Sequence, residues 1–99
     1  MIILAGTIRI APGMREKALP HIRAIVEASR AEPGCLEYSM AFDAMDDHLV
    51  RIFEVFENDE AREAHRRSSH MDTWRNSWAE AGVGDRDMMR YVVTERAPT

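Results

Sequence analysis

The chain has 99 residues, a formal net charge of −4 at pH 7 and 45% apolar residues. This length predicts a single domain, residues 1–99, and the apolar content excludes a largely disordered protein. No run of basic residues is longer than Arg66-Arg67, so we expect neither nucleic acid nor a membrane surface as a partner. The single cysteine excludes an internal disulfide, and so small a core predicts self-association.

The N-terminal segment gives no sign of export. Residues 1–6 are apolar but lack the basic residues that open a secretory signal. No stretch reaches the roughly 20 apolar residues that a membrane-spanning helix requires. We therefore expect a cytoplasmic protein.

The first half of the chain predicts a strand followed by a helix. Residues 2–10 alternate with the period of a strand, whereas residues 14–30 carry apolar side chains at helical spacing. Pro20 interrupts the helical pattern, which predicts a kink or a late start. Glu32-Pro33-Gly34 ends the helix, because proline disfavours the helical conformation at the residue before it.

Two alternating segments follow, residues 35–42 and 49–56, and the turn at 43–48 makes them a hairpin. Both faces of the second segment are largely apolar, so we expect both to be covered. The predicted shared faces are Leu36, Tyr38, Met40 and Phe42 on the first strand, and Val50, Ile52, Glu54 and Phe56 on the second.

The last third predicts two helical pieces and a strand. Asn58 suits the N-cap of the first piece, and Ser68 or Ser69 can cap the second. The second piece ends at Gly82–Gly84, and residues 88–95 return as a strand. The resulting order, βαββαβ, predicts an α+β ferredoxin-like fold: a four-stranded antiparallel sheet with its helices on one face. The other face is partly apolar, which predicts a homodimer packed sheet against sheet.

Three motifs resemble those of the antibiotic biosynthesis monooxygenase family. The resemblance implies a dimeric α+β barrel with a pocket between sheet and helices in each subunit. It also implies oxidation of electron-rich aromatic substrates by dioxygen without metal or flavin. The motifs are Glu32-Pro33-Gly34-Cys35-Leu36-x-Tyr38, Phe53-Glu54-x-Phe56-x-x-x-x-Ala61 and His65-x-x-Ser68-x-His70-Met71.

Some family features are missing. Phe56 stands where the family often has tryptophan, which would change the shape of the pocket. Haem-degrading relatives have Asn, Trp and His at positions that correspond to Gly6, His65 and Arg75 here. Because none of the three is kept, haem degradation is disfavoured.

The candidate catalytic residues are His65, Glu54 and His70. His65 falls on the inward stripe of its helix, so it is either a base in a pocket or a hydrogen-bonded filler of the core. His70 lies at a helix start and has the same alternatives. Glu54 can orient an imidazole if its face meets the helices, or pair with arginine if that face meets a second subunit.

The candidate substrate-binding residues could equally be structural. Trp74 and Trp78 are spaced as helix-core residues and could form a pocket wall. Tyr38 could place its hydroxyl in the pocket or pair across a dimer, and Arg75 could hold an anionic oxygen. Phe56 completes the set of Tyr38, Phe56, Trp74, Arg75 and Trp78.

We predict neither a metal nor another cofactor. Glu54, His65 and His70 could supply three ligands, but His65 and His70 point about 140° apart on a continuous helix. A break near Ser68 would remove that obstacle. Gly82-Val83-Gly84 follows a helix, whereas a dinucleotide-binding loop follows a strand.

The hypothesis from the sequence is a cofactor-independent monooxygenase that acts on a small quinol-, phenol- or anthrone-like aromatic with dioxygen. In it His65 takes a proton, so that the substrate becomes electron-rich enough to reduce dioxygen. Two alternatives stay open: a dimeric small-molecule binding protein without catalysis, and an isomerase that moves a proton with the same histidines.

Overall fold

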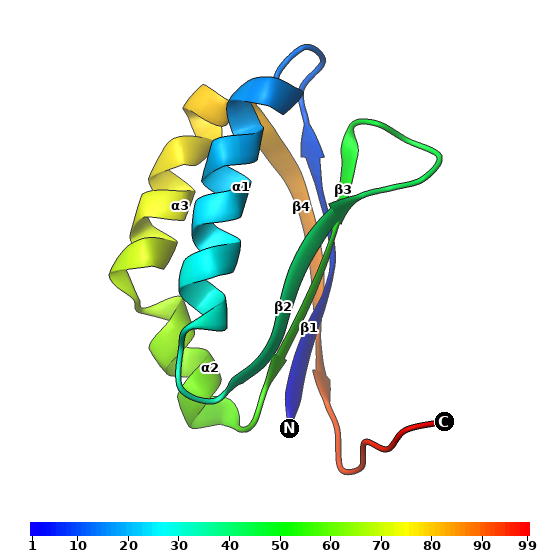
Figure 1. The fold of residues 1–99 in the computed structure, drawn as a ribbon, viewed down its shortest axis with the longest axis vertical. Coiled ribbons are helices and arrows are strands. Elements are labelled where there is room, and N and C mark those ends of the chain that lie inside the picture. Colours follow the sequence, from blue (N-terminus) through cyan, green and yellow to red (C-terminus); the bar gives the residue numbers. More distant parts are fainter.

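The computed structural model describes all 99 residues, Met1–Thr99. The strands pair antiparallel throughout, in the order β2-β3-β1-β4. Figure 1 shows the three helices on one face of the sheet, with the other face uncovered. The predicted ferredoxin-like α+β fold is therefore confirmed. In chain order the elements are β1 (Ile2–Ile10), α1 (Arg15–Arg30), β2 (Cys35–Phe42), β3 (Leu49–Phe56), α2 (Asp59–Arg66), α3 (Ser69–Ala81) and β4 (Val83–Val92).

The core lies between the sheet and the helices. Period-two alternation on β1 and β3 sends every second side chain to the helix side, where the stripes of α1 and α3 meet it. Figure 1 shows α1 and α3 lying side by side over the sheet, with α2 at the end where α1 finishes. The buried apolar side chains include Ile2, Leu4, Ile8, Ile10, Ala18, Ile22, Ile25, Val50, Ile52, Phe56 and Trp74.

Helix α1 does not start late at Pro20, as one of the sequence-based alternatives proposed. It begins at Arg15 and runs through Pro20, which is exposed. Proline removes the donor that would otherwise bond the carbonyl four residues earlier, at Glu16 in the first turn. The missing hydrogen bond therefore falls near the solvent-exposed start of the helix, where it costs least.

Strand β4 differs from its predicted bounds, since it begins at Val83 rather than Met88 and ends at Val92. Gly82 ends α3 in the left-handed conformation, with φ +70°, and the strand follows directly. A register shift against β1 lies between Thr7 and Arg9, and such an irregularity hides the alternating pattern in the sequence. Gly6 allows β4 to approach, because a Cβ there would lie 2.0 Å from the carbonyl oxygen of Asp87.

Strand β2 also contains an irregularity. Cys35 pairs with Phe56 and Glu37 with Val55, so Leu36 is an extra residue in the ladder. Leu36 is consequently 43% exposed, and the prediction that it shares the buried face of Tyr38 is wrong. From Tyr38 onward the alternation holds, and Tyr38 is buried toward the helices.

The uncovered face of the sheet carries large apolar side chains. Phe53 on β3 and Met89 and Tyr91 on β4 lie on this face and are 38%, 58% and 49% exposed. The expectation that β3 is covered on both faces is therefore not met within one chain. None of the helices combines the length and the apolar character needed to cross a membrane.

Candidate active site

A break between two short helices brings His65 and His70 together. The Asn58 side chain accepts a hydrogen bond from the backbone N–H of Ala61 at 2.8 Å and starts α2. The Ser68 hydroxyl accepts one from Met71 at 3.2 Å and starts α3. His65 lies in the last turn of α2 and His70 in the first turn of α3. Because the chain changes direction between them, their ring centroids are only 6.0 Å apart.

Glu32, in the segment between α1 and β2, joins the two histidines. Its Oε2 accepts a hydrogen bond from His65 Nδ1 at 2.8 Å and is also hydrogen-bonded to His70 Nε2. An ionised carboxylate can only accept, so Nδ1 of His65 carries the proton and Nε2 is left with its lone pair. Glu32 therefore takes the orienting position that the sequence analysis offered to Glu54.

His65 is 3% exposed and lies between the rings of Tyr38 and Phe56, whose centroids are 5.3 and 5.0 Å away. Burial lowers the pKa of His65 below its ordinary value, and the hydrogen bond that His65 donates to Glu32 opposes this only in part. The imidazole is thus neutral near pH 7. Its unprotonated Nε2 lies 3.7 Å from Oε1 of Glu54.

Glu54 is on the helix-facing side of β3, as one of the two alternatives required. Its side chain is 8% exposed, and Oε1 has no hydrogen-bond partner. Burial raises its pKa to about 7, against the opposing effect of the charges of Arg62 and Arg86. Glu54 therefore exchanges a proton close to neutral pH, which suits a group that handles protons in a reaction.

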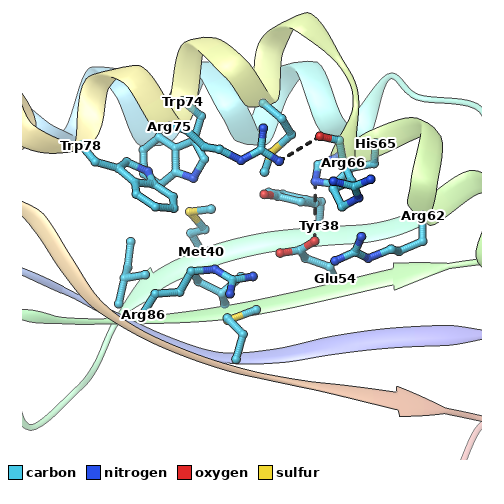
Figure 2. A pocket seen from close by; sticks show the side chains of 14 residues that line it. Tyr38, Met40, Glu54, Arg62, His65, Arg66, Trp74, Arg75, Trp78 and Arg86 are labelled. Atoms are coloured by element: carbon cyan, nitrogen blue, oxygen red, sulfur yellow. Dashed lines mark hydrogen bonds and ion pairs between the residues drawn. The ribbon is translucent and has the colours of Figure 1, made fainter.

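A cavity of about 410 Å³ opens in front of these two groups, between the sheet and the helices α2 and α3. Figure 2 shows Trp74, Arg75 and Trp78 along the helix side, and Glu54, Met40 and Arg86 on the sheet side. The lining residues are Ile8, Tyr38, Met40, Ile52, Glu54, Arg62, His65, Arg66, Met71, Trp74, Arg75, Trp78, Arg86 and Met88.

Most of the residues predicted from the sequence line this cavity: His65, Glu54, Tyr38, Trp74, Arg75 and Trp78. Phe56 does not, since it is fully buried and packs against the ring of His65. His70 also lies outside the lining and is bonded to Glu32 behind His65. These two residues touch the site through His65 rather than through the cavity.

Four charged residues of the site were not singled out from the sequence. In the sequence, Glu32 served only to mark the end of a helix. The feature that could have identified it is its place at the start of the first family motif, directly before Pro33-Gly34. Arg62 precedes His65 by three residues, a spacing that puts both on one side of α2. Arg66 carries no comparable signal, and Arg86 carries none because β4 was predicted to begin after it.

The cluster of Glu32, His65 and His70 could also hold a cation. One possible ligand atom from each residue lies within 4.8 Å of the others, and two imidazoles with a carboxylate are a common ligand set for zinc or iron. Direct hydrogen bonds satisfy the same atoms without an ion. The ligand set considered from the sequence was different, because it contained Glu54 in place of Glu32.

The geometry is that of an acid–base site. A neutral imidazole is held by a carboxylate on one nitrogen and presents the other to a cavity, beside a carboxyl group that titrates near pH 7. Eight of the fourteen lining residues are apolar, which lowers the local dielectric and strengthens electrostatic effects inside. Such a site can remove a proton from a hydroxyl or an activated carbon and return it later.

Comparison with known proteins agrees with this fold. An uncharacterized protein of Synechocystis, sll1783, is 36% identical over 64 residues, which are 65% of this chain and 44% of that protein. The chain thus spans less than half of that relative. The crystal structure of PA3566 from Pseudomonas aeruginosa is 32% identical, with TM-score 0.79 and 97% and 94% of the two chains covered.

A structure from Deinococcus radiodurans, named a "putative antibiotic biosynthesis monooxygenase", superposes with a TM-score of 0.91. It covers 100% of this chain and 98% of its own, at 22% identity, so it supports the fold alone. The family model described as antibiotic biosynthesis monooxygenase matches residues 1–77, which include the strand–helix corner that carries Glu54 and His65. On this match the chain belongs to the antibiotic biosynthesis monooxygenase family.

Proposed function

We propose that the protein is a cofactor-independent monooxygenase that oxidises a small electron-rich aromatic compound of the quinol, phenol or anthrone type with dioxygen. The observation that carries the proposal is the neutral His65, whose Nε2 faces the cavity while Glu32 holds Nδ1. Family membership supports the reaction class, and the site supports the proton transfer that starts it.

In the proposed reaction His65 Nε2 takes the proton of a substrate hydroxyl. The resulting anion passes one electron to dioxygen, and the substrate radical and superoxide combine to form a carbon–oxygen bond. The peroxide then breaks its O–O bond, so that one oxygen atom stays on the substrate and the other leaves as water. The proton returns from His65. For a quinol, substrate plus dioxygen gives hydroxyquinone plus water, and the substrate supplies all the electrons.

The hydroxyl of Tyr38 and the carboxyl of Glu54 are available to hydrogen-bond the developing oxyanion. Burial, first of all, and the charge of Glu54 raise the pKa of Tyr38, so its hydroxyl keeps its proton and can donate. Glu54 can donate in its protonated form, whose population is large near its pKa of about 7. Trp74 and Trp78 would form the wall against which the ring packs.

The proposed active form is a homodimer joined through the uncovered face of the sheet. Phe53, Met89 and Tyr91 supply the apolar surface for this contact. Phe53→Glu would place a charge in the interface, so we expect it to convert the dimer to a monomer in sedimentation velocity experiments. Glu60→Gln on the exposed side of α2 is the control. A wild-type chain that sediments as a monomer at micromolar concentration would contradict the dimer.

The reaction is tested by measuring oxygen consumption with a panel of quinols, naphthols and anthrones, and by following one atom of labelled dioxygen into the product. We expect one dioxygen consumed for each substrate, and no product under anaerobic conditions. Product formation without oxygen would instead establish the isomerase. Stoichiometric binding with no oxygen uptake across the panel would establish the non-catalytic binding protein.

A further inference from the structure

The cavity has an excess of positive charge, although the whole chain is acidic. Four arginines from α2, α3 and β4 line it, whereas Glu54 is the only carboxylate in the lining. The imidazole of His65 adds no charge near pH 7, because burial lowers its pKa. Clustered guanidinium groups in a cleft attract anions and hold carboxylates in a planar, two-bond geometry. The four are Arg62, Arg66, Arg75 and Arg86.

Two of these arginines already have partners. Arg66 pairs with Glu63 at 3.1 Å. Arg75 contacts Asp72 at 3.3 Å and donates to the backbone carbonyl of Arg66 at 2.8 Å. These contacts fix both side chains at the edge of the cavity. Each guanidinium keeps further N–H donors, but a carboxylate already compensates part of its charge.

Arg62 and Arg86 are different. Arg62 reaches Glu63 only at 3.6 Å, and Glu63 is shared with Arg66 and Arg67. Arg86 has no carboxylate within 4.0 Å and no side-chain hydrogen bond. Both lie close enough to Glu54 for their charges to lower its pKa, and Figure 2 shows Glu54 between them. Two cations thus face a single carboxyl group.

Residues that line the cavity also carry buried polar atoms without a protein partner. Four buried side-chain polar atoms of the chain lack a hydrogen bond, and three of them belong to lining residues: Nε of Arg62, Nε1 of Trp78 and Oε1 of Glu54. The first two are donors. Buried donors in native proteins are almost always satisfied by the protein, by water or by a ligand, and acceptor oxygens of a ligand would suit these two.

We propose that the substrate is an aromatic acid, in which an anionic carboxylate beside the oxidisable ring binds between Arg62 and Arg86. This inference rests on the proposed function for the identity of the ring, and on the arginines and unpartnered donors for the acid. The ring then lies toward Trp78 with its hydroxyl near His65. The carboxylate would pair with Arg86, which is exposed and has no carboxylate of the chain beside it.

Binding of this acid is coupled to the protonation of Glu54. The charged and titratable groups that face Glu54 are Arg62 and His65 on α2, Arg86 on β4, Glu32 before β2 and Tyr38 on β2. An added anion between the arginines repels the ionised form of Glu54. Because the pKa of Glu54 is about 7, the acid should bind with little proton uptake below that pH and weaken as the pH rises above it.

The test compares 1,4-dihydroxy-2-naphthoate with 1,4-dihydroxynaphthalene by titration calorimetry without oxygen, near pH 6. We expect the acid to bind at least about tenfold more tightly. Arg62→Gln and Arg86→Gln should each remove most of this preference while the neutral compound binds as before. Arg23→Gln, at an exposed position on α1 outside the cavity, is the matched control and should change neither affinity.

The wild-type protein gives an independent measurement if a variant folds poorly. Raising NaCl from about 0.05 to about 0.5 M should weaken binding of the acid and leave the neutral compound unaffected. Equal affinities for the two compounds would overturn the proposal. So would a preference that survives in both arginine variants, since the arginines would then serve only to neutralise Glu54.

The failure of this inference is distinguishable from failure of the proposed function. If the acid binds preferentially but no oxygen is consumed, the anion site stands and the monooxygenase proposal fails. If the neutral quinol binds as tightly and is oxidised as fast as the acid, the monooxygenase proposal stands and the anion site is refuted.

Discussion

Two polar regions meet at His65 and differ in how completely their groups are paired. Behind the ring, Glu32 accepts hydrogen bonds from both histidines, and all three side chains have partners. In front of it, Glu54, Arg62 and Trp78 each present a buried atom without one. The paired region fixes the tautomer and orientation of His65. The unpaired region is where a ligand can gain hydrogen bonds.

The difference has an energetic consequence. A buried polar group without a partner costs about 1–3 kcal/mol relative to a satisfied one. Where no water molecule replaces the missing partner, the groups around the cavity therefore lower the stability of the empty protein. A ligand that satisfies the unpaired atoms recovers this free energy as binding affinity.

The largest expected effect comes from removing the ring that joins the two regions. His65→Ala should lower kcat/KM by about 10²-fold or more, because proton transfer by a positioned base contributes on that order. The measurement is oxygen consumption with the best substrate found. His48→Ala, in the exposed turn between β2 and β3, should retain full activity. Undiminished activity in the His65 variant would remove this ring from the mechanism.

A smaller loss of activity is expected from a change in the paired region. Glu32→Gln keeps the shape but loses the charge that holds Nδ1–H, so kcat/KM should fall about tenfold. The Glu32 contact raises the pKa of His65 against the lowering effect of burial, so the variant should have a still lower pKa. The acid limb of the kcat/KM profile should then move to lower pH. A fall in activity with no shift of this limb would mean that Glu32 acts only on folding.

On the unpaired side, Glu54→Gln should increase stability at alkaline pH. Glu54 has a folded-state pKa of about 7 against 4.5, so the folded protein holds its proton longer than the unfolded chain. Its contribution to stability therefore falls as pH rises from about 4.5 to about 7. We expect the variant to match the wild type near pH 4.5 and to be more stable by about 1–2 kcal/mol at pH 8. Urea unfolding at both pH values measures this difference, and a less stable variant at pH 8 would contradict it.

The smallest expected effect is that of metal removal. If hydrogen bonds alone satisfy the Glu32 cluster, dialysis against a chelator should leave both activity and thermal stability unchanged. Metal analysis of the purified protein should then find less than about a tenth of an equivalent of zinc or iron. A stoichiometric ion, with activity lost on chelation and restored by adding it back, would assign the cluster as a metal centre instead.

The sequence predicted the fold well where one local pattern decides the structure. The alternation of residues 2–10 and 49–56, and the helical spacing of residues 14–30, correspond to β1, β3 and α1. It failed where pairing is irregular. The extra residue Leu36 in β2 and the register shift between β1 and β4 break the period of two. The predicted face of Leu36 and the predicted start of β4 were therefore wrong.

The site was predictable only in part, for a related reason. His65 and Trp74 follow from the inward stripes of their helices, whereas the sequence left two alternatives for the face of Glu54. Glu32 and Arg86 come from a loop and an irregular strand, where no periodicity says which way a side chain points. His70 and Phe56 were predicted to be site residues, but neither lines the cavity. His70 is hydrogen-bonded to Glu32, and Phe56 packs against the ring of His65.

By itself the sequence determined the order of strands and helices, the residues that share each face of β1 and β3, and the presence of a histidine and a carboxylate near one corner. The tertiary structure alone decided that Glu32 holds His65, that Glu54 is left without a partner, and that Arg62 and Arg86 lie on either side of it. The physical reason is the range of each interaction. Periodicity acts within an element, whereas hydrogen bonds and charge pairs join groups that only the packing of separate elements brings together.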